Sequence, residues 1–424
     1  MEKTQPMEHT TEPEAPKGAL LAIFAVALVD MLGFGLVIPL LPFYARRFSA
    51  TPLQVTLLFS IFSACQFVAT PILGSWSDRI GRRPILIFSL IGSAAGYALL
   101  GYASEHKWTS VVLGLWMVYL SRIIDGLTAG NISAAQAYIS DVTTAENRTK
   151  GMGMLGAAFG LGFSLGPAAG GILAAHFTLA TPAWVACGMA LIAAFLALRL
   201  IRESRSHIPS EATNYFHPRQ FLPLLRNRPL MTINIGWFVA MASFVAVDAA
   251  IVMYLTDVFY FDKHGVAYFF LLIGLVIIIT QGRLVGPLGK RFGEWKLCIA
   301  GLILNGFSGI LTAMTIWYPL KRILITSAVI GAFGRSLFQP TISALVSHHS
   351  DPRYQGRSFG FFQGVGTLAR VVGPLLAGYI YAYHKSWPWI FSAGFLLATA
   401  LWLAVLRMQE APQVPEATSY TSEN

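Results

Sequence analysis

Acidic side chains inside long apolar segments are the residues of this sequence best suited to proton chemistry. Asp30 is flanked by Val29 and Met31, and Asp248 lies within the apolar run 245–251. An ionisable residue at the centre of a membrane costs about 2.5–3.5 kcal/mol on insertion scales, so each is a candidate for function. A carboxyl group that loses its hydration favours its neutral form, as a proton carrier requires. We interpret Asp30 and Asp248 as proton-coupling residues; for Asp30 the alternative is an acid that packs helices and bonds to backbone or hydroxyl groups.

A basic and an acidic residue share one predicted helix. Arg122 and Asp125 are three residues apart, so their side chains lie on nearly the same face. They form either a structural ion pair or part of a site for proton coupling.

Two further arginines, Arg335 and Arg370, lie inside apolar segments of the second half. A buried arginine needs an anionic partner, which is either an aspartate or the substrate. If either faces a cavity unpaired, the substrate carries a carboxylate or a phosphate. If both pair with Asp30 or Asp248, a zwitterionic or cationic compound is equally compatible. Arg283 lies near the end of its segment and is predicted to help gate that side.

Aromatic and glutamine side chains in the same segments suit a broad apolar cavity with a few polar groups. Most aromatics in such segments only pack or anchor, so this substrate-binding interpretation covers a small set. Its members are Phe34, Phe62, Gln66, Trp237, Gln339 and Gln363.

The composition places all of these residues in a membrane protein. Hydrophobic residues make up 55% of the 424 residues and charged residues 12%, against about 25% charged in soluble domains. Lipid must therefore cover most of the outer surface. The three cysteines lie in apolar runs, which suggests neither a disulfide framework nor a zinc site. The pattern G-x-x-x-x-G-K-[ST] does not occur, and no cofactor, metal or enzymatic activity is predicted.

Apolar segments long enough to cross a bilayer, about 20 residues each, recur twelve times. The predicted fold class is all-α integral membrane, with twelve transmembrane helices in two pseudo-symmetric six-helix bundles. The predicted helices cover 18–44, 54–76, 84–103, 110–141, 150–176, 183–201, 230–259, 266–288, 296–317, 322–348, 357–383 and 388–407.

A long polar stretch separates the two sets of six helices and defines the predicted domains. The bundles cover 18–201 and 230–408, with a linker at 202–229 and tails at 1–17 and 409–424. Of the thirty basic residues, 19 fall in loops and tails on the side of the N-terminus and 7 in loops on the other side. Because basic residues collect in cytoplasmic loops, both tails and the linker are predicted to be cytoplasmic. The net charge of +10 is thus a topology signal, and no nucleic-acid partner is predicted.

The two halves repeat each other in sequence. Residues 137–167 align without a gap on 344–374 at an offset of 207, and 74–81 align on 286–293 at an offset of 212. Two matches in the same order indicate duplicated six-helix units, which suit alternating access around a central site.

Four segments of the first half resemble signatures of the major facilitator superfamily. The loop 74–84 (GSWSDRIGRRP) resembles the signature between its second and third helices, and 120–130 (LSRIIDGLTAG) resembles its fourth-helix motif. The glycines of 156–171 resemble the fifth-helix motif of its antiporters. The opening 30–42 (DMLGFGLVIPLLP) is most similar to the drug/proton antiporter branch that includes tetracycline exporters.

The resemblance implies roles for several residues. Arg122 would be the motif arginine linked to proton transfer, with Asp125 as its partner, and the loop 74–84 would lock the cytoplasmic side in one state. Asp78 is expected to accept hydrogen bonds from exposed helix N-terminal amides, and Arg79, Arg82 and Arg83 to pair with acids such as Asp141. The full set of predicted gating residues is Gly74, Asp78, Arg79, Gly81, Arg82, Arg83, Asp141, Gly166, Pro167 and Arg283.

The predicted function is a proton-coupled secondary transporter, acting as a monomer in a bacterial inner membrane, that exports amphipathic organic compounds. Tetracycline exporters carry functional acids in the third and ninth helices, whereas 85–100 contains no acid here and the ninth helix offers only Asn305. Tetracycline is therefore a doubtful substrate. The alternative is an importer of an anionic nutrient, metabolite or iron chelate bound by Arg335 and Arg370; a third is a membrane receptor that does not transport.

Overall fold

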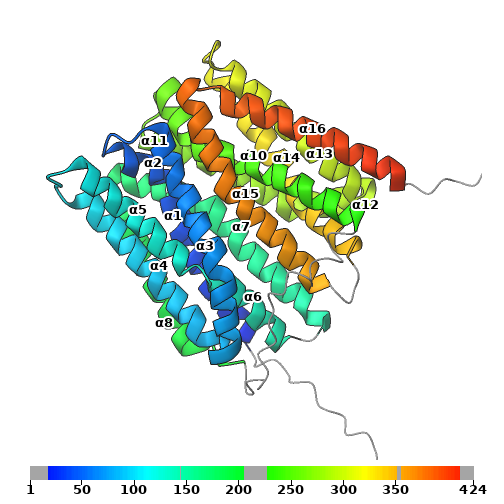
Figure 1. Ribbon diagram of the computed structural model, residues 1–424, viewed down its shortest axis with the longest axis horizontal. Coiled ribbons are helices and arrows are strands. Elements are labelled where there is room, and N and C mark those ends of the chain that lie inside the picture. Colours follow the sequence, from blue (N-terminus) through cyan, green and yellow to red (C-terminus); the bar gives the residue numbers. More distant parts are fainter. Residues whose placement is uncertain (1–17, 144, 205–226, 351–354, 411–424) are drawn as a thin grey trace, which may run out of the picture.

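The computed structural model describes residues 18–143, 145–204, 227–350 and 355–410, which form helices and short connections without a strand. Twelve spans within these residues are long and apolar enough to cross a membrane. The predicted all-α membrane fold is therefore confirmed (Figure 1). Of the predicted tails and linker, 1–17, 205–226 and 411–424 lie outside the described residues.

The helix bounds follow the apolar segments closely. The first six spans are α1 (Ala19–Val37) with η1 (Ile38–Leu40) and α2 (Leu41–Arg46), α3 (Pro52–Ile80), α4 (Arg82–Glu105), α5 (Val111–Leu127) with α6 (Asn131–Val142), α7 (Ala145–His176) and α8 (Thr181–Leu200). The other six are α10 (Arg228–Val258), α11 (Lys263–Ile279) with η3 (Thr280–Leu284) and α12 (Val285–Phe292), α13 (Glu294–Met314), α14 (Lys321–His348), α15 (Gln355–Tyr383) and α16 (Trp387–Glu410).

The fourth span differs from the prediction of one continuous helix over 110–141. Here α5 ends at Leu127, and α6 begins at Asn131 after a short turn. Glycine at position 130 lowers helix propensity, and Thr128 bonds through its hydroxyl group to the carbonyl group of Ile124, which closes the last turn of α5. The break leaves the first residue of α6 free to present its side chain deep within the first half.

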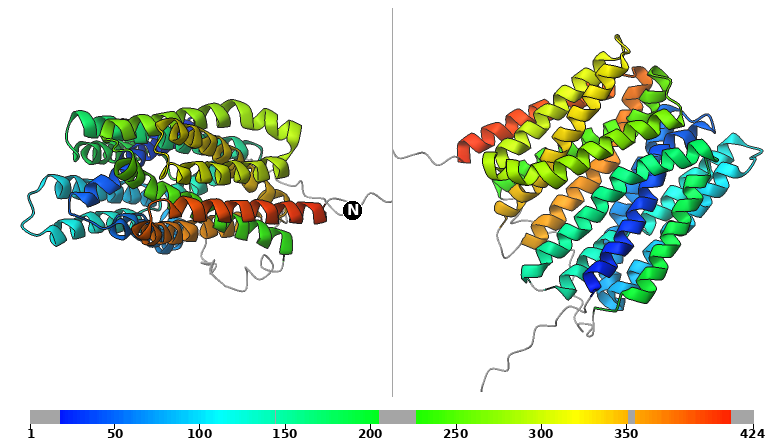
Figure 2. Two further views of the ribbon diagram at one scale, coloured as in Figure 1. Left: turned by 90° about the horizontal axis from the view of Figure 1, so that it is seen from above. Right: turned by 180° about the vertical axis from the view of Figure 1, so that it is seen from behind.

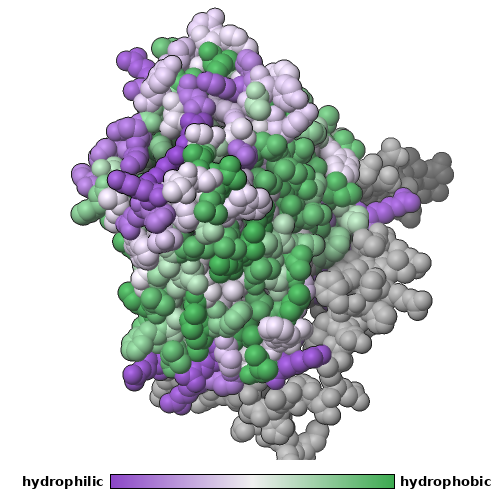
Figure 3. Space-filling view, turned by 60° about the vertical axis from the view of Figure 1, so that its left-hand side comes forward, coloured by the Kyte–Doolittle hydropathy of each residue, from purple (hydrophilic) through white to green (hydrophobic). Residues whose placement is uncertain are grey.

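The surface carries the pattern expected of a membrane protein. On the face shown in Figure 3, hydrophobic side chains form a broad band between hydrophilic groups gathered at its two ends. Large exposed side chains in this chain include Trp116, Phe195 and Leu401, each in the middle or end of an apolar span. Lipid tails can solvate such side chains, whereas water would not.

Helix α7 packs closely on α1 because glycines remove side chains at the contact. A Cβ atom at Gly166 would lie 2.6 Å from the Cα atom of Gly35, and one at Gly162 would lie 2.5 Å from the Cβ atom of Met31. Such small residues let helix backbones approach in membranes. Gly156, which lies earlier in α7, faces open space.

The two halves meet through α3 against α15 and α7 against α11. A Cβ atom at Gly171 would touch Ala267 of the second half at 2.5 Å, and one at Gly378 would touch Thr56 of the first half at 1.8 Å. Gly153 and Gly360 lie eighteen residues before Gly171 and Gly378 on the same helix faces, about 27 Å along each axis. A Cβ atom at either glycine would have no neighbouring atom within 4 Å.

The halves therefore touch near one end of the molecule and separate toward the other. We call the end that holds α2 the sealed end, and the end that holds the α3–α4 connection the open end. Figures 1 and 2 show the same arrangement, with the helices of the two halves converging around α2 and α11 and diverging toward α6 and α12.

Gly166→Ala is expected to destabilise the protein by about 1–3 kcal/mol, because the added methyl group overpacks the contact with α1. Gly156→Ala is the matched control on the same helix and is expected to leave stability unchanged or slightly raised. Unfolding of the purified protein in detergent measures both. Equal stability of the two variants would contradict the proposed packing role of Gly166.

Candidate functional site

An ion cluster joins the two halves at the sealed end. Arg46 donates two hydrogen bonds to Asp257, at 2.5 Å to Oδ1 and 2.8 Å to Oδ2. The hydroxyl group of Tyr381 donates to the same carboxylate at 2.9 Å, and Lys385 Nζ donates to the backbone oxygen of Asp257 at 3.3 Å. The side chains of Arg46 and Asp257 are 32% and 21% exposed. A bidentate, partly buried pair of this kind is among the stronger polar contacts available to a protein.

A second ion cluster lies at the open end within the first half. Arg82 pairs with Asp78 at 2.6 Å and with Asp141 at 2.9 Å. The acid that accepts from the N-terminal amides of α4 is Glu203, at 2.8 Å from the backbone nitrogen of Arg82 and 3.2 Å from that of Arg83. Of the three arginines expected to pair with such acids, Arg82 pairs with Asp141, and the backbone amides of Arg82 and Arg83 donate to Glu203.

The remaining predicted gating residues occupy different places. Gly81 has φ 108°, a conformation that favours glycine, and Arg79 is exposed. Gly74 lines a cavity of about 340 Å³ between α3 and α6. Pro167 lies inside α7, and Arg283 is an exposed residue of the π-helical segment η3.

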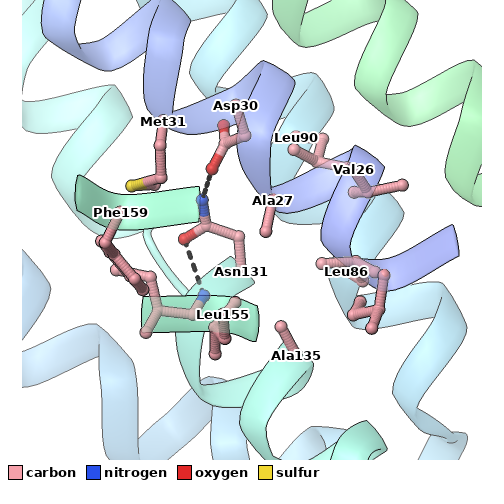
Figure 4. Close-up of a pocket in the computed structure, with 12 residues that line it drawn as sticks. Val26, Ala27, Asp30, Met31, Leu86, Leu90, Asn131, Ala135, Leu155 and Phe159 are labelled. Atoms are coloured by element: carbon pink, nitrogen blue, oxygen red, sulfur yellow. Dashed lines mark hydrogen bonds between the residues drawn. The ribbon is translucent and has the colours of Figure 1, made fainter. Parts of the chain in front are cut away.

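Asp30 is buried inside the first half and does not face the space between the halves. It is 4% exposed, and Asn131, the first residue of α6, donates a hydrogen bond to its Oδ2 atom. A cavity of about 10 Å³ lies beside it, near the volume that one water molecule needs. Figure 4 shows Asp30 and Asn131 pointing toward each other, with apolar residues such as Leu90 and Phe159 around them.

Helix α6 connects this acid to the cluster at the open end. Asn131 bonds to Asp30 at the start of the helix, and Asp141 bonds to Arg82 one residue before its end. Between them, Ser133 lines the 340 Å³ cavity together with Asp78 and Arg82. One short helix therefore touches both sites.

Arg122 and Asp125 form an ion pair buried in the first half. Their atoms Nη1 and Oδ2 are 3.1 Å apart, and the two side chains are 0% and 2% exposed. The guanidinium group also lies over the ring of Tyr97, 5.7 Å from its centroid. Asp125 interacts electrostatically with Asp30, so the pair and the acid of α1 belong to one buried charge cluster.

Asp248 and Arg335 pair in the second half. Arg335 donates to both carboxylate oxygens of Asp248, at 2.9 and 2.7 Å, and stacks over Phe244 at 4.9 Å from the ring centroid. The side chains are 49% and 31% exposed although both lie within membrane spans, so they face an accessible space. Gln339, one turn after Arg335, is exposed as well.

Arg370 lies on α15 and donates a hydrogen bond to the hydroxyl group of Thr367 at 2.8 Å. Gln363, two turns earlier, is exposed. The two arginines therefore differ. Arg335 has an aspartate partner, whereas Arg370 has none among the described residues.

The predicted aromatic residues divide between the two halves. Phe34 and Phe62 are half-buried neighbours in the first half, with ring centroids 5.5 Å apart, and Gln66 one turn further along α3 is half-buried too. Trp237 is 3% exposed and stacks on Phe362 at 4.5 Å, so it packs inside the second half and does not line an accessible space.

Comparison with known proteins decides the family. The family model of the Major Facilitator Superfamily matches residues 23–304 and, again, 282–423. The chain belongs to the Major Facilitator Superfamily. It is similar to the tetracycline resistance protein, class C, of Escherichia coli, with 31% identity over 395 residues that cover 89% of this chain and 94% of the relative. It is also 27% identical to multidrug resistance protein 2 of Bacillus subtilis (strain 168) over 403 residues, or 92% and 95% of the two chains.

Solved structures of the superfamily share the fold. The human organic anion transporter MFSD10 (TETRAN) superposes with a TM-score of 0.69 at 24% identity, covering 94% of this chain and all of that chain. A POT family transporter gives 0.75 at 14% identity, over 93% and 96%. The predicted resemblance to the superfamily and to its tetracycline exporters is confirmed, and this superfamily member is a multi-pass membrane protein of a transporter family.

Sequence reasoning missed several polar residues of this superfamily member. Arg46, Asp257 and Tyr381 had no signal, because they lie in different helices and meet only in the folded chain. Asn131 could have been found, since Gly130 before it weakens the predicted helix at that point.

Arg46→Ala is expected to open the sealed end more often, because it removes two charge-assisted hydrogen bonds worth about 1.5–3 kcal/mol. With Cys65, Cys187 and Cys298 replaced by serine, Thr56→Cys places a thiol at the fully buried contact with α15. Its labelling by a thiol reagent is expected to be about tenfold faster in Arg46→Ala.

Arg47→Ala is the matched control, since Arg47 donates to the backbone oxygen of Ser104 inside the first half. It is expected to leave the labelling rate unchanged. Equal acceleration by both variants would mean that the cluster does not hold the halves together.

Proposed function

We propose that this chain is a proton-coupled secondary transporter that exports amphipathic organic compounds by alternating access. The observation that carries the proposal is the buried Asp30, held by Asn131 beside a water-sized cavity and within the electrostatic reach of Asp125. An acid in such surroundings can take up and release a proton, and its hydrogen bond to α6 changes when it does so.

Alternating access is supported by the unequal contact between the halves. The seam is tight at Gly171 and Gly378 and open at Gly153 and Gly360. A protein in this state admits a molecule from the open end while the Arg46–Asp257 pair blocks the sealed end. Rocking of the halves around the central region then exposes the same molecule to the other side.

Export is supported by the relatives. Several curated relatives bear names that state resistance to tetracycline or to multiple drugs, at 26–31% identity over most of the chain. Because the basic loops flank the open end, we place that end on the cytoplasmic side of a bacterial inner membrane, where it accepts the compound to be exported.

The site residues take the following roles in this proposal. Asp30 carries the proton, the Arg122–Asp125 pair sets the charge around it, and Asp248 with Arg335 forms a second ionisable pair at the accessible space. Phe34 and Phe62 supply apolar surface to the substrate.

Asp30→Asn is expected to abolish coupled proton movement, because an amide cannot take up a proton at neutral pH. The assay uses proteoliposomes that contain a pH-sensitive dye and receives a panel of amphipathic drugs and small organic anions. Asp262→Asn is the matched control, since Asp262 caps α11 at its exposed end and asparagine can cap equally well.

Proton movement that persists in Asp30→Asn at the wild-type rate would rule out Asp30 as the carrier. If no compound moves protons through the wild type, the proposal of proton-coupled export is wrong.

The proposed orientation is tested by alkaline phosphatase fusions, which are active only outside the cytoplasm. A fusion after Tyr318, in the connection between α13 and α14, is expected to be active, and a fusion after Arg407 inactive. The reverse pattern would place the open end outside the cell and would contradict export of a cytoplasmic compound from the state described.

A further inference from the structure

Arg370 differs from Arg122 and Arg335, which also lie within membrane spans. Arg122 pairs with Asp125 and Arg335 pairs with Asp248. Within the part of the chain that the structure describes, Arg370 has no acidic partner, and its one hydrogen bond goes to the hydroxyl group of Thr367 on the preceding turn. A hydroxyl group does not neutralise the guanidinium charge.

The position of Arg370 along the helix puts this charge at the centre of the membrane. The span Arg357–Tyr383 has 27 residues, and Arg370 is the middle one. The side chain is therefore about 20 Å from either end of the span, which is beyond the reach of a snorkelling arginine.

Helix periodicity turns Arg370 away from lipid. Leu368, Leu375 and Tyr379 are 44%, 41% and 54% exposed and form one face of α15. Arg370 projects from the opposite face, as does the exposed Gln363 seven residues before it. An exposed glutamine on the face opposite lipid indicates an accessible space inside the protein.

The neighbouring helices confirm this direction. A Cβ atom at Gly366 would lie 2.8 Å from the Nε1 atom of Trp237 on α10, and one at Gly378 would lie 1.8 Å from Thr56 on α3. At about 100° per residue, Arg370 projects between these two directions, about 40° from the first and 80° from the second. It therefore points between α10 and α3, toward the seam between the two halves, where Ser60 of α3 donates a hydrogen bond to the backbone oxygen of Val371.

Asp248, the aspartate of the second half considered above, already has a partner. Both carboxylate oxygens of Asp248 accept from Arg335. Asp30 is enclosed within the first half and bonds to Asn131. Arg370 is thus a half-buried guanidinium group at mid-span with no carboxylate partner among the described residues. A planar guanidinium group can bind a carboxylate or phosphate through two parallel hydrogen bonds.

We propose that Arg370 is an anion subsite, so that the transported compounds include organic anions whose carboxylate, sulfonate or phosphate group pairs with its guanidinium group. The inference rests on the proposed transport function and specifies its substrate class. Gln363, on the same face, supplies an amide that can donate to the same anion. The proposal applies to export and does not require the direction to be reversed.

The test uses matched ligands that differ by one charge, namely a panel of aromatic carboxylic acids such as dansylglycine, each with its neutral carboxamide. Binding to the purified full-length protein is measured by fluorescence or calorimetry for wild type, Arg370→Gln, Arg370→Lys and Arg199→Gln. Arg199, at the end of α8 near Phe195, is the control for loss of a positive charge outside this region.

We expect wild type and Arg199→Gln to bind at least one acid about tenfold or more tightly than its amide. Arg370→Gln is expected to lose this preference while it keeps the affinity for the amide, and Arg370→Lys to keep part of the preference. Thermal unfolding adds a second readout. Removal of an unpaired buried charge is expected to raise the melting temperature of the ligand-free protein, whereas removal of a structural ion-pair partner lowers it.

Three results would overturn the inference. These are a wild type that shows no preference for any acid, a preference that survives in Arg370→Gln, and a loss of ligand-free stability in Arg370→Gln. If inorganic phosphate alone abolishes the acid preference at low millimolar concentration and no organic acid competes with it, Arg370 holds an inorganic anion and the inference about the substrate is wrong.

The outcome is separable from that of the proposed function. Export of neutral or cationic drugs that depends on Asp30, with no acid preference, would leave the proposed transporter intact and refute the anion subsite. An acid preference that depends on Arg370, without proton movement through Asp30, would do the opposite.

Discussion

An ionised side chain inside an apolar bundle is tolerated only where another group replaces its lost hydration. This constraint organises the interior of the protein. Arg335 of α14 is held by Asp248 of α10, and Asp30 of α1 is held by Asn131 of α6, so each pairing also fixes two helices relative to each other. The same rule makes Arg370 conspicuous, because its hydrogen-bond partner among the described residues is a hydroxyl group and not a carboxylate.

The internal repeat preserves positions more faithfully than chemistry. By the two alignment offsets, Arg82 corresponds to Glu294 and Asp141 to His348. In the first half Arg82 pairs with Asp141 at 2.9 Å, and in the second half His348 Nε2 lies 3.1 Å from Glu294. The contact is kept while the acid and the base exchange helices, and the second pair is ionic only when the histidine is protonated. At the open end the two halves therefore keep an equivalent side-chain contact, but the acidic and the basic residue occupy opposite helices.

Much of this architecture could be predicted from the sequence, because the length of an apolar segment and the placement of charges depend on residues close together in the chain. Twelve spans follow from apolar runs, and the pairing of Arg122 with Asp125 follows from a spacing of three residues on one helix. Contacts between segments far apart in the sequence could not be predicted. Nothing near Arg46 indicates that it meets Asp257, 211 residues away, and the choice of Asp248 as the partner of Arg335 stayed open until the helices were packed.

Two contacts of the first half were missed for the same physical reason. The side chain of Asp30 points toward α6, and its position in an apolar segment does not reveal this direction. The amides at the start of α4 donate to Glu203, which lies beyond the sixth span and which no sequence pattern singles out. In each case the helix was placed correctly and the rotation or the neighbour was not, because both are set by tertiary packing.

Because the fourth span is interrupted, α6 is a short separate helix that links two sites of the first half. Its twelve residues form a segment about 18 Å long. A short turn separates it from α5, and it bonds to Asp30 at one end and to Arg82 at the other. A continuous helix would spread any displacement at Asn131 along the whole span. A short separate helix would carry such a displacement from Asn131 to Arg82, at the connection between α3 and α4.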